Sequence, residues 1–277
     1  MARSIPDSLE IPQADRALAS SSGAGALRIL VASHKLAPVP RDPAYLPVLA
    51  GSALGPPVPG FARDDSGENI SAKNPSYCEL TAMYWAWKNL EAGAVGLVHY
   101  RRYFKVRGAI ASQEDFAAAL EKADAILPAK RNYFIESTYS QYAHAHHAKD
   151  LDAARSAIEK LHPRFLDAFD RTMKSTKGHR FNMFVMKRPL FDEYCEWLFG
   201  ILSELEKTID TTGYSAYDKR VFGFIAERLL DVWISAKRVR FAEMPVVHTE
   251  GENWPLKIFR FLRRKFGYSS SSSLSPA

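Results

Sequence analysis

The feature that most constrains the fold is an alternation of short, β-rich apolar runs with helical segments. The runs "LRILVASHK" (27–35), "AVGLVHY" (94–100) and "ADAILPA" (123–129) each have the composition of a buried strand. A short helix is expected at 114–122, between the last two runs. Strands that alternate with helices in this way are typical of a largely parallel sheet covered by helices. The sequence therefore predicts an α/β fold with a mixed, mostly parallel, Rossmann-like sheet.

The chain of 277 residues is long enough for one large domain, which we place at 27–250. Residues 1–26 lack the apolar core of a signal peptide and are expected to be a disordered lead, and 251–277 are expected to form a basic helix with a serine-rich tail. The proline-rich stretch 38–59 contains too many breakers to be regular. The remaining expected elements are helical segments over 136–175, a strand at 181–188, helices at 189–210 and 217–237, and a strand at 239–248.

Composition and charge limit the class of protein. Apolar residues make up 47% of the chain and charged residues 25%, the usual balance of a globular protein. No run reaches the roughly 18 apolar residues that a membrane span needs. Cys78 and Cys195 have no metal-like spacing and are expected to be buried free thiols, which favours a cytoplasmic location. The net charge of +6 favours an anionic partner, which composition leaves open among nucleic acid, lipid headgroups and nucleotide phosphates.

Two of the predicted strands end in clusters of hydrogen-bond donors. The first ends in Ser-His-Lys at 33–35, and "VGLVHYRRYF" runs into His-Tyr-Arg-Arg at 99–102. Ligands of open α/β sheets bind beyond the carboxyl ends of the strands, and arginine can bind a phosphate through two parallel hydrogen bonds. The strand ends therefore predict an anion site. The alternative is that Arg101 or Arg102 pairs with a carboxylate such as Glu79.

A second polar cluster stands where a loop meets a helix. Asn69, Ser71, Lys73 and Asn74 precede a helix that is expected to begin at Asn74-Pro75 and to be capped by Ser76. A helix N-terminus offers free N–H groups and favours anions, so this cluster is a further candidate for binding. Helix capping alone is the alternative for Asn74 or Ser76.

The later part of the chain contains two groups of ionisable residues. Three histidines lie within 144–147, but they do not share one helical face at the spacing that a zinc site needs. Arg220 and Glu227 are seven residues apart and are expected to lie on one face of a helix among aromatic side chains. An ionisable pair of this kind is either functional or a structural ion pair. No phosphate loop, zinc ligand set, kinase signature or nucleophile elbow is present in the sequence.

Long stretches of the chain, in order, resemble one bacterial family. They are "NISAKNPSYCELTAMYWAWKNL", "VGLVHYRRYF", "ILPAK", "QYAHAHHAKDL", "NMFVMKRPLFDEYCEWLFGILSELEK" and "RVFGFIAERLL", and they cover about residues 28–250. The family is that of the capsular and exopolysaccharide biosynthesis glycosyltransferases, also called domain of unknown function 4422. The resemblance implies a GT-A-like fold and transfer of a sugar from a nucleotide-sugar donor to a capsular, exopolysaccharide or lipid-linked glycan. Because some members look like galactofuranosyltransferases, it also implies a UDP-linked donor, with galactofuranose as one candidate sugar.

The resemblance suggests roles for individual residues. His99, Arg101 and Arg102 would bind the donor diphosphate and stabilise its developing charge, as a metal does in related transferases. No Asp-x-Asp motif follows a strand, and dependence on Mg²⁺ or Mn²⁺ stays open. Glu227 is the first candidate for the base that deprotonates the acceptor and Asp218 the second, unless Glu227 forms a salt bridge with Arg220 or Arg228. Further candidates are His34, Lys35, Asn69, Ser71 and Asn74 for the donor, and His146 and Asn182 for the acceptor.

The expected partners are a nucleotide sugar, a glycan acceptor and an anionic membrane surface, and not a nucleic acid. The segment "NWPLKIFRFLRRKF" (253–266) gathers its apolar residues on one broad arc, with four cations opposite. Such a helix is expected to lie on the inner face of the plasma membrane, which makes the protein peripheral. The alternative is that its apolar arc packs on the domain. A non-catalytic nucleotide- or polysaccharide-binding protein of a capsule locus is the alternative to the enzyme.

Overall fold

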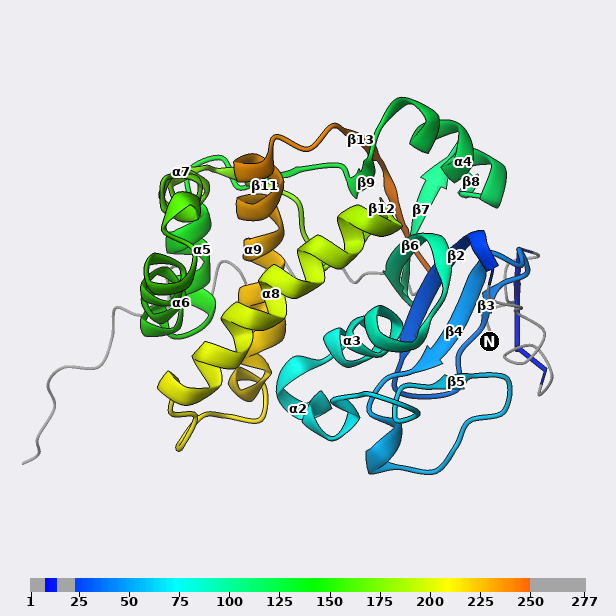
Figure 1. Ribbon diagram of the computed structural model, residues 1–277, viewed down its shortest axis with the longest axis horizontal. Coiled ribbons are helices and arrows are strands. Elements are labelled where there is room, and N and C mark those ends of the chain that lie inside the picture. Colours follow the sequence, from blue (N-terminus) through cyan, green and yellow to red (C-terminus); the bar gives the residue numbers. More distant parts are fainter. Residues whose placement is uncertain (1–7, 14–22, 250–277) are drawn as a thin grey trace, which may run out of the picture.

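The computed structural model describes residues 8–13 and 23–249, and its strands form one large sheet and two short ladders (Figure 1). The strands are β1 Leu9–Glu10, β2 Gly23–Ser33, β3 Val39–Pro40, β4 Tyr45–Leu49, β5 Ala62–Arg63, β6 Ala92–His99, β7 Arg102–Val106, β8 Ala109–Ile110, β9 Ala125–Pro128, β10 Arg131–Asn132, β11 Lys177–Gly178, β12 Phe184–Lys187, β13 Phe241–Met244 and β14 Val246–His248.

The large sheet has ten strands and mixed direction. Its main path runs β13-β9-β12-β6-β2-β4-β5, and β7 joins β8 and β14 to the end of β6. The ladders β13-β9, β6-β2, β2-β4 and β4-β5 are parallel. β12 runs antiparallel to both of its neighbours. The predicted α/β class with a mixed sheet is therefore confirmed.

Helices cover the sheet on both faces. They are α2 Asn74–Tyr77, α3 Leu80–Asn89, α4 Gln113–Lys122, α5 Thr138–Ala145, α6 Ala148–Leu161, α7 Leu166–Lys174, α8 Arg188–Thr208 and α9 Val221–Lys237. Figure 1 shows α3, α8 and α9 on one side of the sheet, with α5, α6 and α7 beyond them, and α4 near the opposite end. No helix in the described part of the chain is long and apolar enough to cross a membrane.

The alternation of side chains along the strands produces two cores. Leu30 and Leu97 point into the larger core, which they share with buried residues of α3, α8 and α9. Val31 and Val98, the next residues along, point into the second core, together with Phe116 of α4. Successive side chains of a strand face opposite sides of a sheet, so a continuous apolar run is the pattern expected of strands that are buried on both faces.

Three expectations about the elements are wrong in the described residues. The proline-rich stretch contains β4, all five residues of which are buried between β2 and β5 despite Pro47. The strand expected at 239–248 is two strands, β13 and β14, on either side of Pro245. The lead expected to be disordered contributes β1, which pairs with β3 because Leu9 buries its side chain there. The basic helix expected at 253–266 lies outside the described residues.

Candidate functional site

A cavity of about 330 Å³ lies at the carboxyl ends of β4, β2 and β6. These strands are parallel neighbours, with Leu49 paired to Ser33 and Ala32 paired to His99. One wall of the cavity therefore consists of the residues at or just beyond their ends, namely Ala32, Ser33, His34, Ala50, His99 and Arg101. This edge is where open α/β sheets bind ligands.

The opposite wall comes from the break between α2 and α3 and from the segment before α9. Its residues are Asn74, Pro75, Cys78, Glu79, Ala216 and Arg220. The backbone of Cys78 has a left-handed φ of 55°, and the Asn74 amide stabilises this break by donating to the Cys78 carbonyl oxygen at 2.8 Å. Arg220 Nε donates to Cys78 Sγ at 3.1 Å and so ties the start of α9 to the same point. Strained backbone at a non-glycine residue is common at functional sites.

The imidazole of His99 is neutral and presents an N–H group. Burial, together with the positive charges of the neighbouring Arg101 and Arg102, lowers the pKa of His99 to about 3. Its Nδ1 accepts a hydrogen bond from the Arg101 backbone N–H at 3.3 Å, so the ring proton lies on Nε2. The ring also packs against Tyr100, with 4.4 Å between ring centroids. His99 can therefore donate one hydrogen bond without adding charge.

This depressed pKa gives a direct prediction for the protein without ligand. The ring proton signals of His99 should not shift between about pH 5 and 8, the range over which an ordinary histidine titrates. Histidine-selective NMR spectra recorded across this range, with a His99→Gln variant for assignment, measure it. A transition near the usual histidine pKa would show that the ring is solvated rather than buried between the two arginines.

Glu79 supplies the carboxyl group of the cavity. Asn182 Nδ2 donates to Glu79 Oε1 at 2.7 Å and to the Gly223 carbonyl oxygen at 3.0 Å. Burial raises the pKa of Glu79, an effect that the Asn182 hydrogen bond opposes. A carboxylate whose pKa is raised is a stronger proton acceptor than an ordinary one, which suits it to proton transfer. Asn182, expected to bind the acceptor, instead contacts Glu79 and is itself buried.

The predicted donor residues separate into two groups. His34, Asn74, His99 and Arg101 line the cavity. Lys35 and Arg102 do not line it; the Lys35 ammonium lies 5.3 Å from the centre of the Tyr100 ring, and the Arg102 guanidinium lies 4.5 Å from the centre of the Phe181 ring.

Asn69 and Ser71 hold the loop that precedes α2. The Asn69 amide donates to the Asp65 and Gly67 carbonyl oxygens at 3.0 and 2.9 Å. Ser71 is fully buried and donates to the Asp64 carboxylate. These hydrogen bonds hold the loop itself, and neither residue lines the cavity.

Glu227 lies in a network of charged groups outside the cavity. Its carboxylate accepts from the Phe181 backbone N–H and from Arg228 Nη1, both at 2.9 Å, and lies 3.9 Å from Arg180 Nε. Arg180 and Arg228 are both buried. Of the two arginines expected as partners, Arg228 contacts Glu227, whereas Arg220 precedes α9 and contacts Cys78. Glu227 is not among the residues that line the cavity.

We expect Glu227→Gln to lower the free energy of unfolding by about 1.5–3 kcal/mol, the usual worth of hydrogen bonds to charged groups. Glutamine keeps an acceptor for Phe181 but removes the charge that faces two buried guanidinium groups. Chemical denaturation measures the loss. Equal stability of the variant and the parent would mean that the charge of Glu227 contributes nothing to the free energy of unfolding.

His146 and Asp218 form a second polar group among aromatic rings. His146 stacks on Phe224 at 4.0 Å between ring centroids, and its Nδ1 lies 3.6 Å from Asp218 Oδ1. Burial lowers the pKa of His146 to about 4, so the ring is neutral. Ser215 donates to the Asp218 carboxylate at 2.6 Å, the main cause of the lowered pKa of Asp218. Neither residue lines the cavity.

The described residues do not fit a divalent metal. Within 8–13 and 23–249, no group of three or more histidine, cysteine, aspartate or glutamate side chains is placed to hold one. In the cavity, one carboxyl group stands with the guanidinium groups of Arg101 and Arg220. No step of the reaction proposed below is assigned to a metal.

Three residues of the cavity were not assigned a role from the sequence. Glu79 entered only as a partner for an arginine, Arg220 only as a partner for Glu227, and Cys78 only as a buried thiol. Cys78 and Glu79 stand four and five residues after Asn74, about one helical turn beyond the polar cluster, which is a signal that they share its surroundings. Burial raises the pKa of Cys78 to about 11, so its sulfur is a thiol rather than a nucleophilic thiolate.

Comparison with known proteins assigns the family. The model of domain of unknown function 4422 matches residues 28–238. The chain belongs to this family. Among solved structures it is similar to the apo structure of the WbbM bifunctional glycosyltransferase, with 32% sequence identity and a TM-score of 0.77. The similarity covers 82% of this chain and 46% of that one, so the chain spans less than half of its structural relative. No curated protein matches it.

Proposed function

We propose that this member of the family is a glycosyltransferase that takes a sugar from a nucleotide-sugar donor. The observation that carries the proposal is the cavity at the carboxyl ends of three parallel strands, in which two arginines and a neutral histidine face a half-buried carboxyl group. Similarity to a chain named as a bifunctional glycosyltransferase supports the same class of reaction.

We assign the cavity residues separate roles in such a transfer. Arg101 and Arg220, with the Nε2–H of His99, bind the diphosphate and stabilise the negative charge that develops as the sugar leaves. The bond between the anomeric carbon and the phosphate oxygen breaks, and its electron pair stays on the phosphate. The acceptor hydroxyl oxygen forms the new bond to the anomeric carbon and gives its proton to Glu79. Glu79 thus takes the role first considered for Glu227 and Asp218, because it lines the cavity and they do not.

Two finer assignments complete the proposal. Asn182 acts as a positioning residue, since its amide holds Glu79 Oε1. The donor is UDP-linked, with galactofuranose as one candidate sugar, and the acceptor is a capsular, exopolysaccharide or lipid-linked glycan at the cytoplasmic membrane face. Lys35 and Arg102 add positive charge near the cavity without lining it.

Purified protein mixed with a panel of UDP- and other nucleotide sugars tests the proposal. We expect one donor to raise the melting temperature and to be hydrolysed slowly to the free nucleoside diphosphate, as transferases do without an acceptor. Stabilisation by a nucleotide without release of diphosphate, even with glycan acceptors added, would favour the non-catalytic binding protein. Absence of stabilisation by any nucleotide would contradict both.

A further inference from the structure

A turn after β10 exposes two large apolar side chains. Phe134 is 79% exposed and Ile135 is 77% exposed, the highest values among the large hydrophobic residues that the structure describes. They are adjacent in sequence, so they form one apolar tip rather than scattered surface residues. Burying two such side chains against another apolar phase is strongly favourable.

The turn is held in shape by hydrogen bonds. Phe134 has a left-handed φ of 57°, an unusual conformation for a bulky residue. Its N–H donates to Asn132 Oδ1 at 2.9 Å, and the N–H of Ile135 donates to the Tyr133 carbonyl oxygen at 2.7 Å. The buried Arg180 donates from Nε to the Tyr133 hydroxyl at 3.1 Å, which anchors the turn to the interior. The apolar tip is therefore presented by a fixed backbone.

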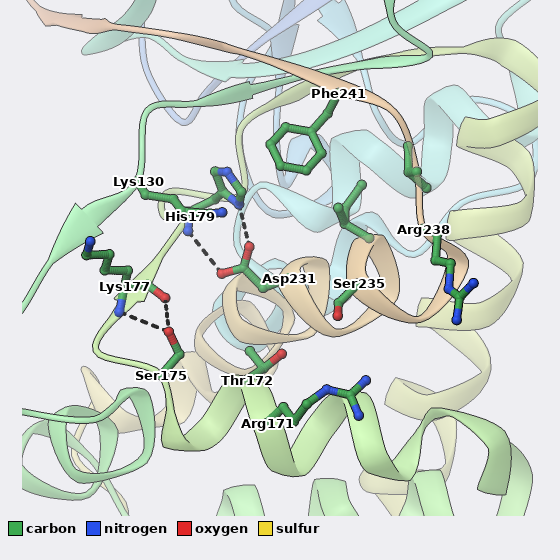
Figure 2. A pocket seen from close by; sticks show the side chains of 12 residues that line it. Lys130, Arg171, Thr172, Ser175, Lys177, His179, Asp231, Ser235, Arg238 and Phe241 are labelled. Atoms are coloured by element: carbon green, nitrogen blue, oxygen red, sulfur yellow. Dashed lines mark hydrogen bonds and ion pairs between the residues drawn. The ribbon is translucent and has the colours of Figure 1, made fainter.

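A cavity with several cationic side chains lies beside the β10-β11 ladder from which this turn projects. This cavity of about 440 Å³ between α7, α9 and β13 is lined by four cationic side chains, those of Lys130, Arg171, Lys177 and Arg238 (Figure 2). Figure 2 shows Arg171 projecting from α7 and Arg238 from the end of α9. Lys130 immediately precedes β10, and Lys177 is paired with Asn132 across the β10-β11 ladder. The cavity and the apolar tip are therefore both connected to the β10-β11 ladder.

The carboxylates of Asp231 and Glu243, near this cavity, already have partners within the protein. Figure 2 shows His179 and Asp231 pointing toward one another; Asp231 accepts from the His179 backbone N–H at 3.0 Å and pairs with the ring Nδ1. Glu243 lies 3.2 Å from His179 Nε2 and 3.8 Å from Lys130 Nζ. Arg171, Lys177 and Arg238 are exposed at the rim, where they can meet an external anion.

We propose that this face docks on an anionic lipid surface, with Phe134 and Ile135 inserted among the acyl chains and the cationic cavity bound to lipid headgroups. An apolar tip with a basic surround matches the layered chemistry of a membrane interface, where apolar burial and attraction to anionic headgroups add together. The residues of this surface are distinct in sequence from the basic segment 253–266. This surface is also separate from the cavity that contains Glu79, so it can fail while the proposed reaction stands.

Sedimentation of the full chain with vesicles tests this surface. We expect the parent to bind vesicles of phosphatidylcholine mixed with phosphatidylglycerol more tightly than phosphatidylcholine alone. The double variant Phe134→Asn and Ile135→Ser should lose about tenfold or more of this binding. Asparagine tolerates the left-handed backbone, which protects the turn. Leu54→Ser, at an apolar side chain that is 57% exposed elsewhere, is the matched control and should bind as the parent does.

Two further variants test the cationic cavity and the insertion of the apolar tip separately. Lys177→Glu should weaken binding to anionic vesicles and leave binding to phosphatidylcholine unchanged. Phe134→Trp should add blue-shifted fluorescence that brominated lipids quench, beyond the signal of the parent's own tryptophans. Vesicle binding by the double variant equal to that of the parent would overturn the proposal and assign the membrane contact to another segment. Failure of the parent to bind anionic vesicles would overturn it as well.

Discussion

Arg101→Ala is expected to weaken UDP binding by about 2–5 kcal/mol, a loss of roughly 30-fold to several thousand-fold, as is typical when a charged partner is removed from a desolvated contact. Arg101 lines the cavity directly beyond the end of β6, where it reaches the same space as His34 and His99. When the Arg101 guanidinium is removed, only the Arg220 guanidinium is left in the cavity to bind the diphosphate. Isothermal titration calorimetry with UDP measures the effect.

Two other variants, one in the cavity and one outside it, show whether the effect is specific to the cavity. Arg220→Ala should weaken UDP binding in the same range, because Arg220 faces Arg101 from the opposite wall. Arg164→Ala removes an exposed arginine that contacts Phe165 in the helical layer, and it should bind UDP as the parent does. If Arg101→Ala stays folded and binds UDP normally, the diphosphate lies elsewhere.

Glu79→Gln is expected to abolish transfer while leaving donor binding nearly unchanged. Loss of a general base typically costs about 10²- to 10⁴-fold in rate. Glutamine keeps an oxygen that accepts from Asn182, so the side chain should stay in place. Because burial raises the pKa of Glu79, the rate of the parent should increase as the pH rises through that raised pKa. Turnover with a glycan acceptor and UDP release across the pH range measure both effects.

The same substitution should make the folded protein more stable at neutral pH. A carboxyl group whose pKa is raised on folding favours the folded state at low pH, and this contribution is lost as the pH rises through the folded pKa. Glutamine cannot ionise and so avoids the loss. We expect the melting temperature of Glu79→Gln to exceed that of the parent at neutral pH. Below the pH range in which carboxyl groups usually titrate, the two melting temperatures should be equal. Glu227→Gln should do the reverse, with lower stability and retained turnover. Full activity of Glu79→Gln would remove this residue from the mechanism.

The regular parts of the fold follow from local pattern. The apolar runs ending at residues 35 and 100 correspond to β2 and β6, and the helix expected at 189–210 is α8, Arg188–Thr208. These segments are predictable because burial of a strand or of one helical face imposes a period on the sequence itself. β4 was missed because Pro47 is a local breaker, whereas the pairing with β2 and β5 that outweighs it is a tertiary contact.

The sequence by itself determined that polar side chains stand at the carboxyl ends of two strands, and it predicts that they form one anion site. Parallel strands bring these ends to one edge, so His34, His99 and Arg101 had to converge wherever β2 and β6 are neighbours. Only the tertiary structure decided which carboxylate joins them. Glu227 has Arg228 next to it in the sequence, whereas no arginine lies within 15 residues of Glu79, and neither pattern shows which glutamate reaches the cavity. The packing of α2 against the start of α9 places Glu79 in the cavity, and the buried Arg180 and Arg228 hold Glu227 outside it, because charge partners are chosen by distance in space rather than along the chain.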